Sequence, residues 1–130
     1  MPESKKGTIL VIDDESMHIN LVQLVLQKGN YVVLRAENAA NGIEIARKQH
    51  PDIILMDIRL PVIDGLEATR RIKSDPELKN IPVVALSASV MMRDIEKSLE
   101  AGCVGHLSKP IEVKNFVDVM EKIVSQGHAA

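Results

Sequence analysis

The stretch IILMD at residues 53–57 decides the fold of this 130-residue chain, because its apolar residues lead directly into a carboxylate. A second apolar run, Thr8 to Ile12, has the same form and is followed at once by Asp13 and Asp14. Uninterrupted apolar runs of this length are typical of strands that are buried on both faces of a parallel sheet. The two runs are therefore predicted to be central parallel strands, each with an acid at its carboxyl end.

Strands and helices are expected to alternate along the rest of the chain. Further apolar runs predict strands at residues 31–34, 82–87 and 105–108. Helical spacing of apolar residues predicts helices at residues 15–28, 39–48, 64–74, 89–101 and 112–125. Alternation of this kind predicts an α/β fold, a doubly wound (βα)5 parallel sheet with helices on both faces.

The last predicted helix has the clearest apolar stripe. Its members are Val113, Phe116, Val117, Met120, Ile123 and Val124. Asp64, followed by Glu67, is expected to cap the third helix. Residues 1–7 and 126–130 have neither stripe nor apolar run, so we expect a single domain over 1–130, with an ordered core of about 7–125 and frayed tails.

Composition and charge narrow the class of protein. A hydrophobic content of 45% supports a core without disulfides, and the single cysteine, Cys103, has no internal partner. The 16 basic and 18 acidic residues are spread along the chain, so no basic stripe for nucleic acid is expected. No secretory signal and no membrane-length apolar stretch is visible. We expect a cytoplasmic protein with neither a nucleic-acid nor a membrane partner.

Polar side chains follow the carboxyl ends of the predicted strands. In an open α/β sheet the ligand crevice lies beyond these ends, where the winding direction reverses. The side chains expected to meet there are those of Asp13, Asp14, Asp57, Ser87 and Lys109. The sequence therefore predicts a site with carboxylates, a hydroxyl and an amine.

Neighbouring carboxylates of this kind call for a cation. Each pair repels by about 4 kcal/mol at a separation of about 4 Å if the effective dielectric is near 20. Mg²⁺ relieves such repulsion with a few oxygen ligands and retained waters. Phosphoryl transfer needs an oxygen nucleophile, a metal and a cation that follows the phosphoryl group, and Asp57, the acids 13–14 and Lys109 match these needs.

Four motifs together resemble the response-regulator receiver domain of two-component signalling. They are ILVIDDE at 9–15, PDIILMDIRLPVIDGLEATRRIK at 51–73, PVVALSAS at 82–89 and GHLSKPI at 105–111. The resemblance covers roughly residues 7–124. Within the family, the chain resembles stand-alone, single-domain response regulators. It implies a flavodoxin-like three-layer sandwich with strand order 2-1-3-4-5.

The resemblance also implies residue roles. Asp57 accepts a phosphoryl group from a sensor histidine kinase or a histidine phosphotransfer protein. Ser87 and Lys109 match the switch hydroxyl and the phosphate-binding lysine of the family. The implied ligands of Mg²⁺, for which Mn²⁺ can substitute, are Asp13, Asp14, Asp57 and the backbone carbonyl of Arg59.

One position departs from the family. Receivers often carry Tyr or Phe three residues before the lysine, as a rotating gate, whereas this chain has His106. An imidazole can move inward in the same way, but its charge varies near neutral pH. Arg59 and Ser89 lie where the family tunes dephosphorylation, and the bond between Lys109 and Pro110 is typically cis in the family.

Simpler interpretations of several residues stay open. Asp14 is also a favoured cap for the first helix, and Ser87 for a helix that begins near Ser89. Cys103 is interpreted as a buried structural thiol. The histidines without ligand spacing, expected on the surface, are His18, His50 and His128.

The fourth predicted helix carries an apolar stripe with two interpretations. Its members are Val90, Met91, Met92, Ile95 and Leu99. Much of this stripe is expected to pack on the sheet, while Met91 or Met92 is a candidate for contact with a partner.

The leading hypothesis is a single-domain response regulator that signals by contact with a downstream protein, because only six residues follow Val124. It is a phosphoacceptor switch that catalyses its own phosphorylation and dephosphorylation, not an enzyme for external substrates. The first alternative is a receiver excised from a hybrid kinase or larger regulator. The second is a Mg²⁺-dependent aspartyl-phosphate phosphohydrolase, although no acid stands two residues beyond Asp57. A flavin carrier is disfavoured by the acidic first loop.

Overall fold

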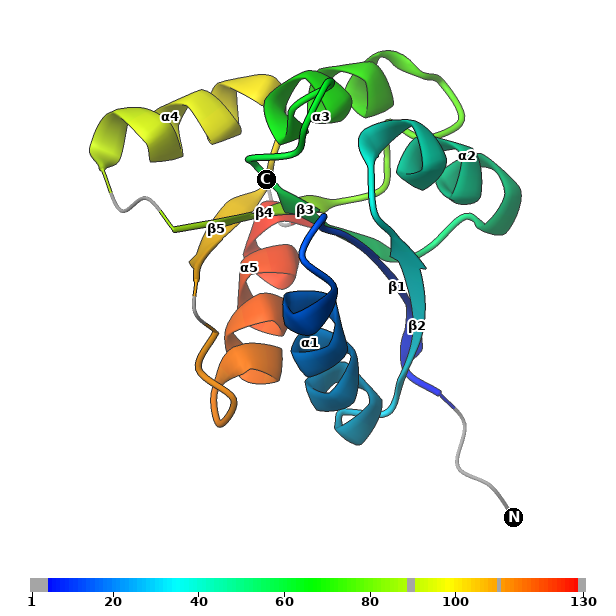
Figure 1. The fold of residues 1–130 in the computed structure, drawn as a ribbon, viewed down its shortest axis with the longest axis vertical. Helices are drawn as coiled ribbons and strands as arrows, with labels where there is room; N and C mark the ends of the chain where they lie inside the picture. Colours follow the sequence, from blue (N-terminus) through cyan, green and yellow to red (C-terminus); the bar gives the residue numbers. More distant parts are fainter. Residues whose placement is uncertain (1–4, 89–90, 110, 129–130) are drawn as a thin grey trace.

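Five parallel strands form one sheet in the order β2-β1-β3-β4-β5 (Figure 1). The computed structural model describes residues 5–88, 91–109 and 111–128. The strands are β1 (Gly7–Ile12), β2 (Tyr31–Ala36), β3 (Ile53–Asp57), β4 (Val83–Ser87) and β5 (Gly105–Ser108). The helices are α1 (Ser16–Lys28), α2 (Ala39–Gln49), α3 (Gly65–Ser74), α4 (Met92–Ala101) and α5 (Phe116–His128). The predicted α/β fold and its strand order are confirmed.

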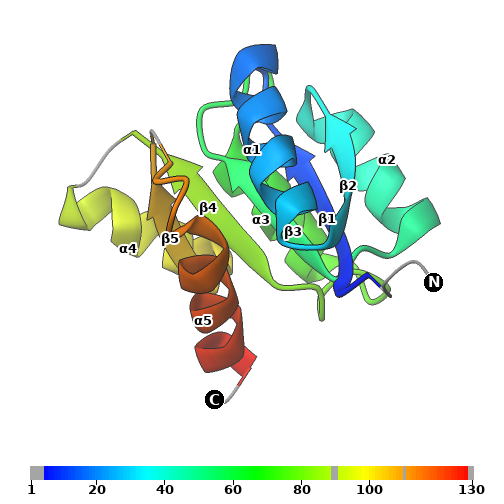
Figure 2. The same cartoon turned by 90° about the horizontal axis from the view of Figure 1, so that it is seen from below.

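The sheet is covered on both faces. Helices α1 and α5 lie on one face and α2, α3 and α4 on the other, as the two views of Figures 1 and 2 show. Successive residues of a strand point to opposite faces, so Ile9 and Val11 of β1 join the core beneath α1 and α5. Leu10 and Ile12 join the core beneath α2 and α3. This double burial explains why β1 is apolar at consecutive positions.

The register of the strands brings their carboxyl ends to one edge. Ile12 of β1 lies opposite Met56 of β3. The residue that follows each of them is an aspartate, Asp13 after Ile12 and Asp57 after Met56. On the other side of β3, Asp57 lies opposite Leu86, and Ser87 lies opposite Ser108. The residues that follow these strands therefore meet at the same edge of the sheet.

Helix α3 begins as predicted, whereas α5 begins later. The Asp64 side chain accepts a hydrogen bond from the Glu67 N–H at 2.9 Å and caps α3. Residues 112–115, predicted as the first turn of the last helix, form a separate turn in which the Asn115 side chain bonds Glu112. Val113 is consequently 53% exposed, and its predicted place in the packed stripe is wrong.

Both ends of the described chain are in contact with the rest of the domain. Lys6 donates its backbone N–H to the Asn30 carbonyl at 2.8 Å, and its ammonium lies 3.3 Å from Glu121 of α5. Gly7 is the first residue of β1, and α5 ends at His128. Residues 1–4 and 129–130, which belong to the predicted tails, lie outside the described residues.

Helix α4 is the least buried of the helices on its face. It buries only Ser98 and Ala101 among its described residues, while Met91, Met92 and Leu99 are 52%, 68% and 47% exposed. The expectation that much of its apolar stripe packs on the sheet is wrong for these three residues, because the side chains that α4 buries are the small ones of Ser98 and Ala101. Val90 lies outside the described residues. No helix in the described parts of the chain is long and apolar enough to span a membrane.

Candidate functional site

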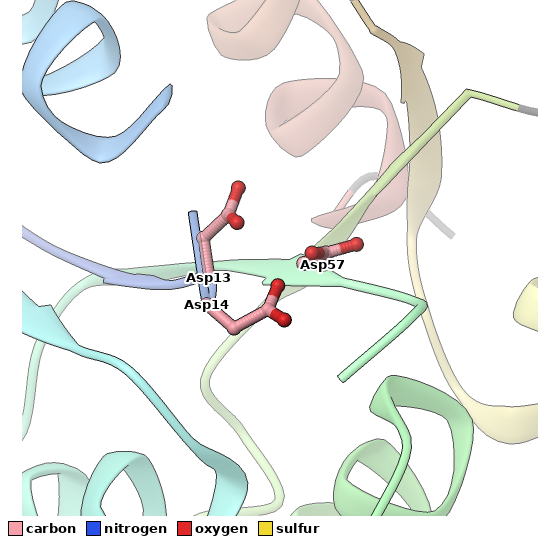
Figure 3. A group of neighbouring side chains, drawn as sticks. All are labelled: Asp13, Asp14 and Asp57. Atoms are coloured by element: carbon pink, nitrogen blue, oxygen red, sulfur yellow. The ribbon is translucent and has the colours of Figure 1, made fainter. Parts of the chain in front are cut away.

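Three carboxylates meet beyond the ends of β1 and β3. Figure 3 shows the side chains of Asp13 and Asp14 next to that of Asp57. Each offers an oxygen, and these oxygens all lie within 4.8 Å of one another. Asp13 has no exposed surface and Asp57 is 3% exposed, whereas Asp14 is exposed to solvent. The predicted acid cluster is therefore present, with two buried members and one open to solvent.

Backbone groups hold the two buried carboxylates. Asp13 accepts the Glu15 N–H at 2.9 Å, and Asp57 accepts the Arg59 N–H at 3.0 Å, each on its Oδ1. Gly65 brings the start of α3 against the end of β3, since a Cβ added there would stand 2.2 Å from the Asp57 carbonyl oxygen. A larger residue at position 65 would push the helix away from the site. Sequence reasoning did not assign this role to Gly65.

Lys109 connects the two buried carboxylates. Its Nζ lies 3.1 Å from Oδ2 of Asp13 and 3.2 Å from Oδ2 of Asp57. It also lies 3.3 Å from Glu15, whose side chain is mostly exposed. Lys109 follows β5, and its backbone N–H donates to the Ser87 carbonyl at 2.9 Å, which ties it to the end of β4. The lysine is thus positioned by the sheet and by the acids together.

The shared lysine leaves the two buried acids with opposite pKa shifts. Burial raises the pKa of Asp57, and the neighbouring Asp13 charge adds to this, while the Arg59 N–H and Lys109 offset only part of it. Burial also opposes ionisation of Asp13, but hydrogen bonds from Glu15, His18 and Lys109 hold its pKa below the usual value. Burial likewise opposes the charge of Lys109, yet the two acids raise its pKa overall. Of the two buried carboxylates, Asp57 is therefore the one whose pKa is raised.

His18 belongs to the site, contrary to the prediction that it lies on the surface. Its side chain is only 12% exposed, and its Nδ1 lies 2.6 Å from Oδ2 of Asp13. The residue stands in the first turn of α1, where long side chains point back toward the helix N-terminus. The signal in the sequence was therefore a histidine five positions after an acid, at the start of a helix, and not a metal-ligand spacing.

Ser87 and His106 line a neighbouring cavity. The site cavity, of about 310 Å³, is lined by Asp14, Glu15, Asp57, Arg59, Ala88 and Lys109. The second cavity, of about 100 Å³, is lined by Ser87 and His106 together with Ile58, Arg59, Leu66, Asp94 and Lys97. Arg59 lines both. The structure therefore brings together the predicted acids and the lysine. Ser87 lines the neighbouring cavity and not the site cavity.

The simpler interpretations of several residues can now be compared with the structure. Helix α1 has Glu15 as its N-cap, without a side-chain cap bond, so Asp14 does not cap it. Helix α4 has Met91 as its N-cap, so Ser87 is not its cap. Cys103 is buried, and burial raises the pKa of its thiol to about 11, as expected for a structural cysteine. His50 is exposed, as predicted.

Three of the sequence expectations cannot be placed. Ser89 and Pro110 lie outside the described residues, and so does the cis bond predicted for Pro110. His128 ends α5, but its side chain is not among those described.

The donor set fits a hard divalent cation. The ligand atoms of Asp13, Asp14 and Asp57 are carboxylate oxygens only, which Mg²⁺ and Ca²⁺ prefer over nitrogen or sulfur. The exposed Asp14 leaves one side open to solvent, which suits an ion that retains waters. A single lysine compensates these acids incompletely, since the pKa of Asp57 stays raised.

Comparisons with known proteins agree with this site. The family model for the response regulator receiver domain matches residues 9–121. The polar-differentiation response regulator DivK of Brucella ovis is 35% identical over 120 residues, which are 92% of this chain and 98% of the relative. DivK of Brucella anthropi is 36% identical over 127 residues, which are 98% of this chain and 100% of the relative.

A solved structure of a receiver domain is similar over most of the chain. The receiver domain of a sensor histidine kinase from Pseudomonas aeruginosa superposes with a TM-score of 0.83 at 29% identity, over 92% of this chain and 98% of that one. That crystal structure is described with a magnesium ion coordinated in the active site cleft. Fold and acid site thus define the class, a phosphoacceptor switch of two-component signalling. The chain belongs to the response-regulator receiver domain family.

Proposed function

We propose that residues 1–130 form a single receiver domain that accepts a phosphoryl group on Asp57. The observation that carries this proposal is the ammonium of Lys109, which lies within 3.2 Å of the nearest oxygen of both Asp13 and Asp57. A cation fixed in this way can contact the anionic oxygens of a phosphoryl group that arrives at Asp57. Asp57 is also buried, and its carboxylate is held by the Arg59 N–H at 3.0 Å.

The proposed donor is a phosphohistidine on a sensor histidine kinase or a histidine phosphotransfer protein. A carboxylate oxygen of Asp57 attacks the phosphorus, and a new O–P bond forms as the P–N bond to the imidazole breaks. The leaving nitrogen keeps the electron pair of that bond and takes up a proton. The Arg59 N–H, bonded to Oδ1 at 3.0 Å, keeps the Asp57 carboxylate oriented during the transfer.

Divalent cation binding is part of the proposal. The proposed ligands of Mg²⁺, or of Mn²⁺ as a substitute, are Asp13, Asp14, Asp57 and the backbone carbonyl of Arg59. The bound cation supplies charge neutralisation at the transferring phosphoryl group. Asp13 and Asp14 would hold it, and the ammonium of Lys109 would contact the phosphoryl oxygens.

The proposed output is contact with a downstream protein, not turnover of an external substrate. Ser87 ends β4 beside the site, and its hydroxyl is proposed to bind a phosphoryl oxygen as the switch. The domain is also proposed to catalyse its own phosphorylation and dephosphorylation. A net charge of −2 gives no support to nucleic acid or a membrane as a partner, and the proposed partner is a protein of the cytoplasm.

Labelling by a small phosphodonor tests the acceptor assignment. Wild type, Asp57→Asn and Asp118→Asn are incubated with acetyl phosphate and Mg²⁺, and the phosphorylated fraction is measured by intact-protein mass spectrometry. Asp118 is an exposed acid on α5 and serves as the matched control. Wild type and Asp118→Asn are expected to be labelled equally, and Asp57→Asn not at all. Equal labelling of all three proteins would refute the acceptor role of Asp57.

A further inference from the structure

Among the residues that the structure describes, the His18 side chain has one polar partner, which is the buried acid Asp13. Its Nδ1 lies 2.6 Å from Oδ2 of Asp13. Its Nε2 is buried and has no hydrogen-bond partner among the described residues. Leaving a ring nitrogen unpaired inside a protein costs stability, and an apolar side chain of similar size would avoid that cost. The polar ring at this position is therefore accounted for by Asp13.

The direction of this hydrogen bond follows from the state of Asp13. The N–H of Glu15 and the ammonium of Lys109 both donate to the Asp13 carboxylate, so Asp13 acts as an acceptor. Its partner on His18 must then be a donor, which places the ring proton on Nδ1. His18 thus holds Asp13 from the α1 side of the site, while Lys109 holds the same oxygen from the β5 side.

The contact becomes more important when Lys109 is engaged elsewhere. In the proposed reaction Lys109 contacts the arriving phosphoryl group, and so its share in holding Oδ2 of Asp13 decreases. Asp13 has no exposed surface, and its hydrogen-bond donors are therefore protein groups. The donors that remain are the Glu15 N–H, on Oδ1, and the His18 N–H, on Oδ2.

We propose that His18 is a positioning residue for Asp13, whose Nδ1–H keeps the carboxylate in its cation-binding orientation and so sets the affinity of the site for Mg²⁺. This inference rests on the proposed function, because it assumes that Asp13 holds the cation. Hydrogen bonds to the ligands of a metal typically change its affinity by about 10- to 100-fold when they are removed. The effect of His18 is expected at the lower end of that range, since the Glu15 N–H remains.

Two substitutions separate positioning from packing. His18→Leu fills the space without a donor, whereas the side-chain N–H₂ of His18→Asn can donate to Asp13 over a reach similar to that of Nδ1. His50→Asn serves as the control, because His50 is exposed and lies at the end of α2 that leads into β3, away from the acids. Thermal unfolding by circular dichroism shows that each variant is folded.

Magnesium affinity is the main measurement. Binding of Mg²⁺ is titrated by calorimetry, and labelling by acetyl phosphate is followed as a function of Mg²⁺ concentration. His18→Leu is expected to raise the Mg²⁺ dissociation constant about tenfold, with a smaller change in the labelling rate at saturating Mg²⁺. His18→Asn is expected to stay within about threefold of wild type in dissociation constant, and His50→Asn to equal wild type.

Different results would overturn the two proposals separately. Wild-type affinity in His18→Leu, or the same loss in His18→Asn as in His18→Leu, would refute the positioning role. So would an imidazole proton on Nε2 and not Nδ1 in the ¹⁵N NMR spectrum of the wild type, a readout that needs no variant to fold. A wild type that neither binds Mg²⁺ nor is labelled would instead refute the proposed function.

Discussion

Two half-buried lysines, Lys73 and Lys109, differ in what surrounds them. Lys73 of α3 donates to two backbone carbonyls, those of Lys79 at 3.1 Å and Ile81 at 2.6 Å. Lys109 lies between the carboxylates of Asp13 and Asp57. Burial lowers the pKa of Lys73, because neutral carbonyls do not offset the loss of water, whereas the two acids raise the pKa of Lys109.

The difference shows how the same residue type serves structure in one place and chemistry in another. Lys73 joins α3 to the loop before β4, and its hydrogen-bond partners are neutral backbone carbonyls. The partners of Lys109 are acids in mutual repulsion, one of which keeps a raised pKa. A cation or a phosphoryl group that binds beside Lys109 changes the charge around it, because it interacts with the same acids. The backbone carbonyls around Lys73 offer no such binding site.

Removal of the Lys109 charge is expected to have the largest effect. Lys109→Met leaves Asp13 and Asp57 buried without their shared cation, and we expect a loss of about 3 kcal/mol in the free energy of unfolding at pH 7 without metal. Urea denaturation in EDTA measures it. Saturating Mg²⁺ should restore part of the loss, because it replaces the missing positive charge. A loss below about 0.5 kcal/mol would contradict the assignment of Lys109 as the main compensating charge.

Removal of the Lys73 charge is expected to lower the free energy of unfolding by less, and Mg²⁺ is expected not to change that loss. Lys73→Met leaves the two loop carbonyls without their donor, and because the lysine is half exposed we expect a loss of about 2 kcal/mol. Lys79→Met, an exposed lysine of the same loop, is the matched control and should change stability by less than about 0.5 kcal/mol. A Mg²⁺-dependent change in Lys73→Met would contradict the structural role.

Cation binding should stabilise the site and leave the Lys73 region unaffected. At a Mg²⁺ concentration ten times its dissociation constant, binding to the folded state alone adds about 1.4 kcal/mol to the free energy of unfolding. Thermal denaturation with Mg²⁺ and with EDTA measures this gain. Wild type and Lys73→Met should gain equally, and Asp57→Asn less. An equal gain in Asp57→Asn would show that the cation binds elsewhere.

Neutralisation of Asp57 is expected to stabilise the metal-free protein modestly. The pKa of Asp57 is raised above its usual value of 3.8 in the folded state, so its ionised form opposes folding at neutral pH. Asp57→Asn should therefore gain about 1 kcal/mol at pH 7 in EDTA. The gain should shrink as pH falls through the raised pKa toward 3.8, since Asp57 then becomes neutral in the wild type too. A loss of stability that is constant with pH would contradict the raised pKa.

Most of the fold was predictable because apolar periodicity is local. The runs at Ile9–Ile12 and Ile53–Met56 identify central strands from consecutive residues, and parallel strands place the acids that follow at one edge. The start of α5 was not predictable in this way, because the apolar stripe continues back to Val113 while Asn115 and Glu112 form a competing turn. A polar side chain that forms a hydrogen bond with a residue close in sequence can favour a turn over a helix. The spacing of hydrophobic residues contains no information about such a bond.

The candidate site was predictable in its acids and its lysine, and less so in the residues around them. Asp13, Asp14, Asp57 and Lys109 stand at strand ends, which the order of elements already identifies. His18 was placed on the surface, because spacing rules search for groups of metal ligands and not for a ring that bonds one acid. The exposure of Leu99 was also missed, since the residues that α4 buries are Ser98 and Ala101, whereas Met91 and Met92 were already candidates for contact with a partner.

The sequence by itself determined the alternation of strands and helices, the strands buried on both faces and the identity of the polar residues at their ends. These follow from local spacing and from the geometry of parallel sheets. The folded structure was needed to show that Lys109 bridges Asp13 and Asp57 and that the two buried acids shift their pKa values in opposite directions. These features depend on distances and burial between residues far apart in the chain, as between Asp13 and Lys109, which no local pattern encodes. The inward turn of His18 toward Asp13 joins residues only five positions apart, but it depends on the burial of the first turn of α1 against the site.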